Sequence, residues 1–344
     1  MNKSFILSTG SYLPEKILTN NEISLIVDTN DEWIKQRTGI TQRHIAGEGE
    51  LTSDLAVEAA KNAMKNAEIS ANDVDLIIVA TTTPDKTFPS CATIVQNKLK
   101  CKNAFAFDVQ AACSGFIYAV TVADSLINSN NKIKHALVIG AEIMSRIVDW
   151  QDRSTCVLFG DGAGAVIMKS TAHFGVIPAC DAGIYGGSQC QATQTTETLA
   201  SGIISTDLYS DGNVDMLCTS GGISSTGDSG TICMNGREVF KHAVDKLIAS
   251  IKETLKCNSL KIADIDWLIP HQANIRIIEA VSKKLELPIE KVISTVDKHA
   301  NTSAASIPLA LDYAIKESKI KPGSLTLLVS IGAGLTWGSI LLRY

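Results

Sequence analysis

The strongest constraint on the fold is an order of helices and buried strands that occurs twice along the chain. Residues 51–70 place apolar side chains at helical spacing after a Ser/Asp start, and 74–84 form a continuous β-branched run that ends in a Thr/Pro loop. Such a run is typical of a strand that is buried on both faces of a sheet. Alternating helices and strands therefore predict a layered α/β fold with covered sheets.

The second half of the chain repeats this order with low identity. Residues 242–274 resemble 56–84, a helix followed by an Asp-initiated strand, and 324–334 resemble 134–142. The matched pieces lie about 190 residues apart, and this nearly constant offset indicates an internal duplication. We therefore predict two similar α/β halves that pack together.

The expected division is an N-terminal half at 1–172 and a C-terminal half at 202–344. The stretch 173–201 between them is rich in Gly, Thr, Gln and Ser and lacks a clear apolar period. We interpret it as a surface loop, an insert or linker between the halves. Active and binding sites of open α/β sheets lie beyond the carboxyl ends of the strands. We therefore expect the site in the loops that follow strands.

The composition excludes several classes of protein. With 45% hydrophobic and 19% charged residues, the chain is typical of a globular protein and not of a disordered one. A net charge of −5 provides no global basic field for nucleic acid, and no stretch approaches the roughly 18 apolar residues of a membrane helix. The first residues lack the apolar run of a secretory signal, and the nine cysteines show neither CxxC pairs nor zinc spacing. We expect a cytoplasmic protein with reduced thiols and with neither nucleic acid nor membrane as a partner.

Cys113 stands where an apolar strand at 103–109 gives way to a helix at 113–129, in the sequence FDVQAACSGF. A thiol at a helix N-terminus lies at the positive end of the helix dipole, which lowers the thiol pKa and supplies a nucleophilic thiolate. The alternative is a small buried thiol that only fills the core. The residues around Cys113 leave both interpretations open.

Two further polar residues follow apolar strands in the second half. His271 directly follows Pro270, in a loop that also carries Gln272, Asn274 and Arg276, and polar residues at such a position indicate a site. Asn301 precedes a Thr-Ser-Ala-Ala run that can open a helix. Each has a structural alternative, because a histidine after a strand is often only hydrogen-bonded and an asparagine is a common helix N-cap.

Taken together, Cys113 in AACSGF, His271 in PHQAN and Asn301 in HANTSAAS resemble the Cys-His-Asn set of the β-ketoacyl-acyl carrier protein synthase III family. The resemblance runs from TGSYLPE near the start to GLTWGSILLRY at the end, with only the Gly/Thr/Gln-rich stretch outside it. It implies a thiolase-like fold, an α/β architecture of two duplicated halves in α-β-α-β-α layers.

The resemblance also implies an acyltransferase that starts type II fatty-acid synthesis. An acyl group, with acetyl favoured, passes from an acyl-CoA to Cys113 and then undergoes decarboxylative Claisen condensation with malonyl-acyl carrier protein. The backbone amides of Cys113 and Ala333 would stabilise the tetrahedral oxyanion, while His271 and Asn301 would stabilise the enolate. No metal and no cofactor is implied, because coenzyme A enters as part of the substrate.

Further positions match the family's binding residues. The family is homodimeric, and its phenylalanine at the position of Phe88 reaches into the acyl pocket of the partner. The matched coenzyme A contacts are Trp33, Arg37, Arg153, Phe240 and Asn274. The matched basic patch for acyl carrier protein consists of Lys241, Arg276, Lys283 and Lys284.

The chain departs from the family pattern at two places beside the expected site. The closing loop is Ile331-Gly-Ala-Gly where the family has Phe-Gly-Gly-Gly, and Arg237 stands where smaller residues are common. These departures keep open a specialised relative that makes a different ketide or uses another acyl acceptor. A catalytically silent scaffold on the same fold and a cysteine hydrolase with His271 as its base also stay open.

Overall fold

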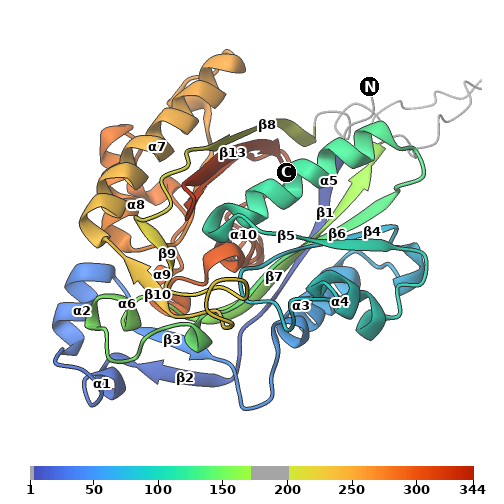
Figure 1. Ribbon diagram of the computed structural model, residues 1–344. Helices are drawn as coiled ribbons and strands as arrows, with labels where there is room; N and C mark the ends of the chain where they lie inside the picture. Colours follow the sequence, from blue (N-terminus) through green and yellow to red (C-terminus); the bar gives the residue numbers. More distant parts are fainter. Residues whose placement is uncertain (1–3, 172–200) are drawn as a thin grey trace, which may run out of the picture.

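A computed structural model describes residues 4–171 and 201–344, so the predicted insert at 173–201 lies almost entirely outside the described residues. The two main sheets are built from separate parts of the chain (Figure 1). The first has the order β1 (Ser4–Tyr12), β7 (Asp161–Ser170), β6 (His135–Ile143), β4 (Leu76–Ala80) and β5 (Phe105–Val109). The second has the order β8 (Gly202–Ser210), β13 (Thr336–Arg343), β12 (Leu325–Gly332) and β11 (Trp267–Pro270).

The four strands of the second sheet repeat four of the five strands of the first in the same spatial order. In each, the first strand of the half lies at one edge, the last strand pairs with it antiparallel, and the next two strands follow in the same spatial order. An isolated parallel bridge between Leu268 and Val292 stands where β5 pairs with β4 in the first sheet. The predicted duplication into two α/β halves is confirmed.

Helices separate and cover the two sheets in the predicted order α-β-α-β-α (Figure 1). The middle layer contains α5 (Gly115–Ser129) and α10 (Ser306–Lys316), and each of these helices contacts strands of both sheets. The outer helices are α3 (Thr52–Asn66) and α4 (Cys91–Leu99) on the first sheet, and α7 (Gly236–Cys257) and α8 (Ile275–Lys284) beside the second. None of the helices in the described residues is long and apolar enough to cross a membrane.

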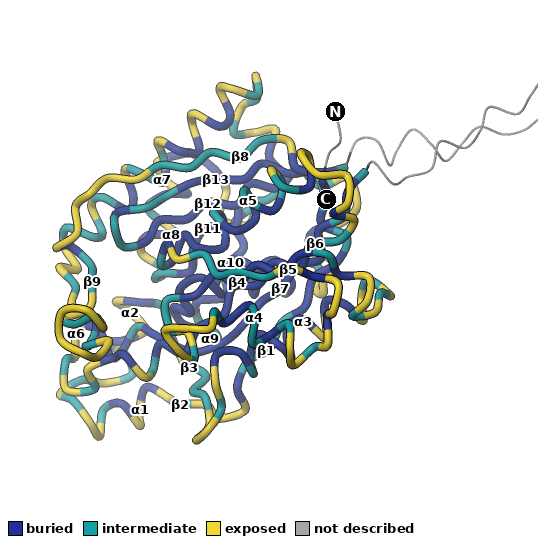
Figure 2. Tube along the Cα trace, turned by 45° about the vertical axis from the view of Figure 1, so that its right-hand side comes forward, coloured by how far each residue is buried: buried dark blue, intermediate teal, exposed yellow. Residues whose placement is uncertain are grey.

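The strand sequences explain why both sheets lie inside. All residues of β4 (LIIVA) are buried, as are those of β12 (LTLLVSIG), because helices cover both faces of these strands. Figure 2 shows this buried interior along β4, β6, β12 and β13, whereas exposed residues gather on the outer helices and loops. The fold therefore keeps water away from the strand ends in the middle of the molecule.

Smaller elements surround one end of this frame. They are β2 (Lys16–Thr19), α1 (Asn20–Ile23), α2 (Asp31–Thr38), β3 (Gln42–Ile45), α6 (Arg153–Cys156), β9 (Leu217–Thr219), β10 (Ile232–Met234) and α9 (Val296–His299). The strands β9 and β10 form an antiparallel hairpin, and β2 pairs with β3. These elements supply the walls of the cavities described below.

The two halves meet where each middle helix begins. A one-turn 3-10 segment, η2 (Ala112–Ser114), precedes α5, and a matching segment, η8 (Ser303–Ala305), precedes α10. Ala112 and Ser303 have φ angles of 45° and 48°, a left-handed conformation that non-glycine residues rarely adopt. Such backbone strain is typical of functional sites, and here it occurs at corresponding positions of the two halves.

Candidate active site

Cys113 lies in η2 directly before α5, at the contact between the halves, and only 7% of it is exposed. Ser114 Oγ donates to the Ala111 carbonyl at 2.9 Å, and Ser330 Oγ of β12 donates to the Cys113 carbonyl at 2.8 Å. Gly332 packs so closely that a Cβ built there would lie 2.7 Å from Cys113 N. Glycine is required at position 332 because it lets the second half's strand reach the nucleophile's backbone.

The thiol of Cys113 is held in its neutral form by its surroundings. Burial is the largest of the causes that raise the pKa of the Cys113 thiol to about 12, and the carboxylate of Glu142 contributes to this rise. Hydrogen bonds from the Ser303 side chain and from the Cys113 N–H act in the opposite direction. The prediction that the helix N-terminus lowers this pKa is therefore wrong, because exclusion of water outweighs the dipole.

His271 follows β11 and points one ring nitrogen at a serine of α10. The backbone N–H of His271 donates to the Val329 carbonyl at 2.8 Å, and the ring atom Nδ1 lies 2.7 Å from Ser306 Oγ. Within the described part of the chain, the other group that contacts Ser306 Oγ is the Gln272 N–H, which is a donor. The hydroxyl proton therefore goes to Nδ1, and the ring carries its own proton on Nε2.

The imidazole of His271 is neutral. Burial lowers the pKa of His271 to about 3, since only 3% of the residue is exposed and no carboxylate within residues 4–171 and 201–344 offsets the loss of water. A neutral ring with Nε2–H donates a hydrogen bond without carrying charge.

Asn301 is fixed by its backbone and by one side-chain contact. Its N–H donates to the Leu158 carbonyl at 2.9 Å, and its Oδ1 accepts from the Ser303 N–H at 2.9 Å. Nδ2 has no acceptor among the residues that the structure describes. The amide therefore presents a donor, and Asn301 turns the chain before η8 without acting as an N-cap of α10.

One cavity of about 500 Å³ brings Cys113, His271 and Asn301 together. Of the predicted coenzyme A contacts, this cavity is lined by Trp33, Arg37, Phe240 and Asn274. Ile331 and Arg237, the two departures from the family pattern, also line it. The cavity thus leads from α2, α7 and α8 to the three candidate catalytic residues.

The remaining coenzyme A candidate, Arg153, lies beside the same entrance. Its guanidinium is 5.0 Å from the centre of the Trp33 ring, and that of Arg37 is 6.0 Å from it. Asn274 has a structural role as well, because its side chain caps α8 by accepting from the Ile277 N–H.

The predicted basic patch lies on the exposed faces of α7 and α8. Lys241, Arg276, Lys283 and Lys284 are all exposed. Arg276 stacks over Phe240 at 5.6 Å and lines the cavity, and Lys284 pairs with Asp245 at 3.2 Å. The patch therefore borders the entrance, with Arg276 at its inner edge.

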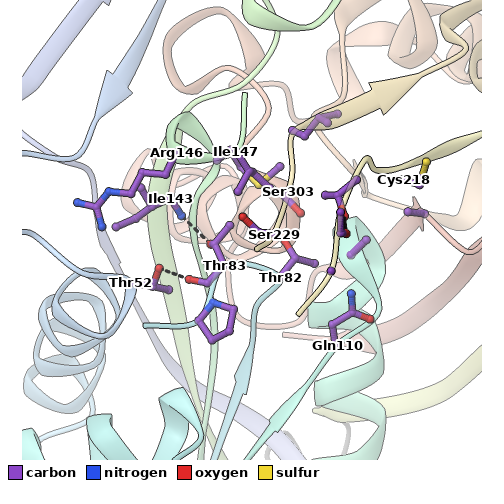
Figure 3. A pocket seen from close by; sticks show the side chains of 18 of the residues that line it. Thr52, Thr82, Thr83, Gln110, Ile143, Arg146, Ile147, Cys218, Ser229 and Ser303 are labelled. Carbon is purple, nitrogen blue, oxygen red and sulfur yellow. Dashed lines mark hydrogen bonds between the residues drawn. The ribbon is translucent and has the colours of Figure 1, made fainter. Parts of the chain in front are cut away.

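A second cavity of about 790 Å³ is also lined by Cys113 and includes Ala333. Figure 3 shows Thr82, Thr83 and Ser303 among its lining residues, and Thr83 joined to Thr52 and to Ile143 by hydrogen bonds. Phe88 does not line this cavity within its own chain. Its side chain is 83% exposed, beside the cavity residues Asp85 to Thr87.

Sequence reasoning missed three polar residues at this site, Glu142, Ser303 and Ser306. Glu142 is completely buried in β6, and its isolated charge within the apolar run KHALVIGAEIM was the available signal. Ser303 and Ser306 belong to the small-residue run after Asn301, and this run indicated only the start of a helix. Their contacts come from the other half or from another loop, so no local pattern reveals them.

Comparisons with known proteins point to the same family as the sequence motifs do, along the whole chain. The family models for 3-oxoacyl-[acyl-carrier-protein] synthase III and for its C-terminal part match residues 107–182 and 255–344. Two proteins named beta-ketoacyl-[acyl-carrier-protein] synthase III, from Wolbachia pipientis wMel and Ehrlichia canis, are 78% and 58% identical over 344 residues, which is 100% of both chains in each case. The crystal structure of 3-oxoacyl-[acyl-carrier-protein] synthase III from Aquifex aeolicus is 46% identical, with a TM-score of 0.86 over 99% of this chain and 100% of that one.

Proposed function

The chain belongs to the β-ketoacyl-[acyl-carrier-protein] synthase III family, and on that premise we propose which of its residues perform the reaction. It is a condensing acyltransferase of fatty-acid synthesis with a thiolase-like fold. The observation that carries the proposal is the cavity where the thiol of one half faces two neutral donors of the other, His271 Nε2–H and the Asn301 amide.

The first half-reaction loads an acyl group from an acyl-CoA, with acetyl-CoA the favoured donor. Cys113 Sγ attacks the thioester carbonyl, and the backbone N–H groups of Cys113 and Ala333 hold the oxyanion. The coenzyme A thiolate leaves with the proton that the Cys113 thiol gave up. The acyl group remains on Cys113 as a thioester.

The second half-reaction condenses this acyl group with malonyl-acyl carrier protein. Loss of carbon dioxide leaves an enolate, whose oxygen accepts hydrogen bonds from His271 Nε2–H and Asn301 Nδ2–H. The enolate carbon attacks the acyl-Cys113 carbonyl, and the Cys113 thiolate departs and takes up one proton from solvent. We propose that no metal and no resident cofactor takes part, because decarboxylation itself creates the carbon nucleophile.

The side chains at the entrance of the 500 Å³ cavity suit the binding of coenzyme A. Trp33 offers an aromatic face beside the guanidinium groups of Arg37 and Arg153, which suits an adenine ring and phosphates. Phe240 and Asn274 line the path from there to Cys113, as expected for contacts with the pantetheine arm. The basic patch on α7 and α8 would receive the acidic carrier protein, its charges acting mainly on the rate of encounter.

We further propose that the protein works as a cytoplasmic homodimer. In the described residues β5 pairs only with β4, so one edge of the first sheet is open, and Phe105 on this edge is 47% exposed and stacks on Phe107. A second copy that covers this edge would also place the exposed Phe88 against the other chain's acyl cavity. The free cysteines agree with a reducing compartment, and the proposed halves remain 1–172 and 202–344 with the insert 173–201 between them.

Intact-mass spectrometry after incubation with a panel of acyl-CoAs tests this function. We expect one acyl adduct that is absent from the Cys113→Ala variant, strongest with acetyl-CoA. The best-loaded chain length identifies the primer. No adduct with any acyl-CoA would contradict the priming function and favour a different donor or a silent scaffold, whereas rapid release of free acid would favour a hydrolase.

A further inference from the structure

Two cysteines face each other across the hairpin of β9 and β10 and have no task in the chemistry above. In the antiparallel register of this hairpin, Cys218 is the direct partner of Cys233. Both thiols are free, and Cys218 is half-buried whereas Cys233 is exposed. The Cys233 S–H donates to the Thr231 carbonyl at 3.7 Å. Such a pair can be oxidised to a disulfide if the spacing of the two strands allows it.

The backbone spacing at this pair suits a disulfide. At the next pair on the same face, the Ser220 N–H donates to the Thr231 carbonyl at 2.8 Å. Hydrogen-bonded pairs recur at every second position of an antiparallel ladder, so Cys218 and Cys233 also form one, with Cα atoms about 5.5 Å apart. Disulfides usually join Cα atoms that are about 4.4–6.8 Å apart. The two cysteines can therefore be bridged without a change of register.

The side chains of the pair extend from the same face of the hairpin, as those of directly opposed residues do. The neighbouring pair shows how closely they approach, because Ser220 Oγ and Thr231 Oγ1 lie 3.5 Å apart. Opposed Cβ atoms are about 4.5–5.5 Å apart, whereas a disulfide needs about 3.5–4.5 Å. A bridge here draws the strands together and is strained, and a strained disulfide at an exposed position is readily reduced again.

The hairpin forms a wall of both cavities that Cys113 lines. Leu217 lines both of them, Ile232 lines the 790 Å³ cavity and Met234 lines the 500 Å³ cavity. Cys218 is among the residues that border the larger one (Figure 3). The ladder has three register pairs, and a two-stranded hairpin of this size is marginally stable by itself. The wall is therefore able to open, and a covalent link across it would hold it shut.

We propose that Cys218 and Cys233 are a redox modification site, at which a peroxide forms a disulfide that holds this wall shut and slows acylation of Cys113. The effect on acylation rests on the proposed function, whereas the disulfide itself does not. The Cys233 sulfur attacks one peroxide oxygen, the O–O bond breaks, and a sulfenic acid and one water form. The Cys218 sulfur then displaces the hydroxyl group from Cys233, which forms the S–S bond and releases a second water. The two thiols lose two electrons and two protons, and the peroxide is reduced to water.

Exposure and charge set the order of these steps and protect the nucleophile. Cys233 is exposed and meets the peroxide first. Burial raises the pKa of Cys218, and the charges of Cys233 and Asp215 raise it too, so Cys218 is less often a thiolate and reacts second. The thiol of Cys113 is buried and has a pKa of about 12, so it reacts with peroxide far more slowly than the pair does.

Peptide mapping after peroxide treatment tests the disulfide. Cleavage before aspartates places Cys218 in the peptide 215–227 and Cys233 in the peptide 228–244. Full-length protein would be treated with hydrogen peroxide, alkylated, cleaved without reduction and analysed by mass spectrometry. We expect these two peptides to be joined, and to separate after treatment with dithiothreitol. Two separate peptides before reduction, or a link of either one to a different cysteine, would overturn the inference.

The rate of Cys113 loading by acetyl-CoA tests the consequence. A bridge that closes a loop of this length lowers the population of the open hairpin by on the order of 10²-fold, so we expect bridged protein to load at least about tenfold more slowly. Dithiothreitol should restore the rate. Peroxide should leave the loading rate of Cys233→Ser as it is before treatment, because no bridge forms. Cys257→Ser, which removes another exposed thiol, is the matched control and should respond as wild type does.

Two results would overturn the effect on acylation. One is an unchanged loading rate in protein that the peptide map shows to be bridged. The other is an equal loss of loading in Cys233→Ser, which would show that Cys113 itself had been oxidised. If untreated wild-type protein does not load at all, the proposed function is wrong instead, and the peptide map still decides whether the disulfide forms.

Discussion

The close contact between Gly332 and the nucleophile gives the sharpest prediction. A Cβ at position 332 would lie 2.7 Å from Cys113 N, 2.8 Å from the Ala111 carbonyl oxygen and 2.9 Å from Ser114 N. All three atoms belong to the backbone, so no side-chain rotation relieves the overlap. Gly332→Ala must therefore push η2 away from β12.

The expected magnitude has two parts. Overpacking of this kind costs about 1–3 kcal/mol of unfolding free energy. Displacing the Cys113 N–H from the oxyanion costs about 10²–10³-fold in rate, the usual effect of losing one such donor. The loss of activity should thus greatly exceed the loss of stability.

The assay pairs denaturant unfolding with the rate of acetyl loading onto Cys113. Gly212→Ala is the matched control, since no atom lies within 4 Å of the added methyl. Loading by Gly332→Ala at the wild-type rate would refute the reasoning that the Cys113 backbone forms part of the oxyanion site.

Three further predictions concern the donors and the entrance. His271 becomes protonated near pH 6.5 in the unfolded chain but only near pH 3 in the folded protein. The free energy of unfolding therefore falls by about 1.4 kcal/mol for each pH unit below 6.5 within this window. Urea unfolding at pH 7.5 and 5.0 should therefore show a smaller decline for His271→Gln than for wild type; equal declines would contradict the assigned pKa. Ser306→Ala should slow carbon dioxide release from malonyl-acyl carrier protein by about tenfold, because Nδ1 loses its hydrogen-bond donor; an unchanged rate would argue against the assigned tautomer. Trp33→Ala should raise KM for acyl-CoA several-fold with a smaller change in kcat, since only entrance contacts are lost; a fall in kcat alone would place Trp33 outside the binding path.

The sequence allowed the architecture to be predicted because its signals are periodic and repeated. The buried run of β4 and its counterpart β11 follow from residue type alone, and their constant offset revealed the duplication. Cys113, His271 and Asn301 could be identified because each follows a strand in a distinctive local motif.

The contacts between the halves could not be predicted in the same way. The pKa of Cys113 depends on how much water η8 and β12 exclude, and neither segment is near Cys113 in sequence. The tautomer of His271 depends on one hydroxyl of α10, and the surroundings of Glu142 combine a loop of its own half with Ser303 of the other. Such properties arise only when both halves are assembled.

The central claim is that Cys113 of the first half carries the acyl group, whereas His271 and Asn301 of the second half stabilise the enolate. One measurement tests it directly. Carbon dioxide release and formation of the condensed acyl carrier protein would be followed together, with acetyl-CoA and malonyl-acyl carrier protein as substrates. We predict equal amounts of both products for wild type, and carbon dioxide without condensed product for Cys113→Ala, since His271 and Asn301 remain intact. Condensed product from Cys113→Ala, or carbon dioxide without condensation from wild type, would contradict the account.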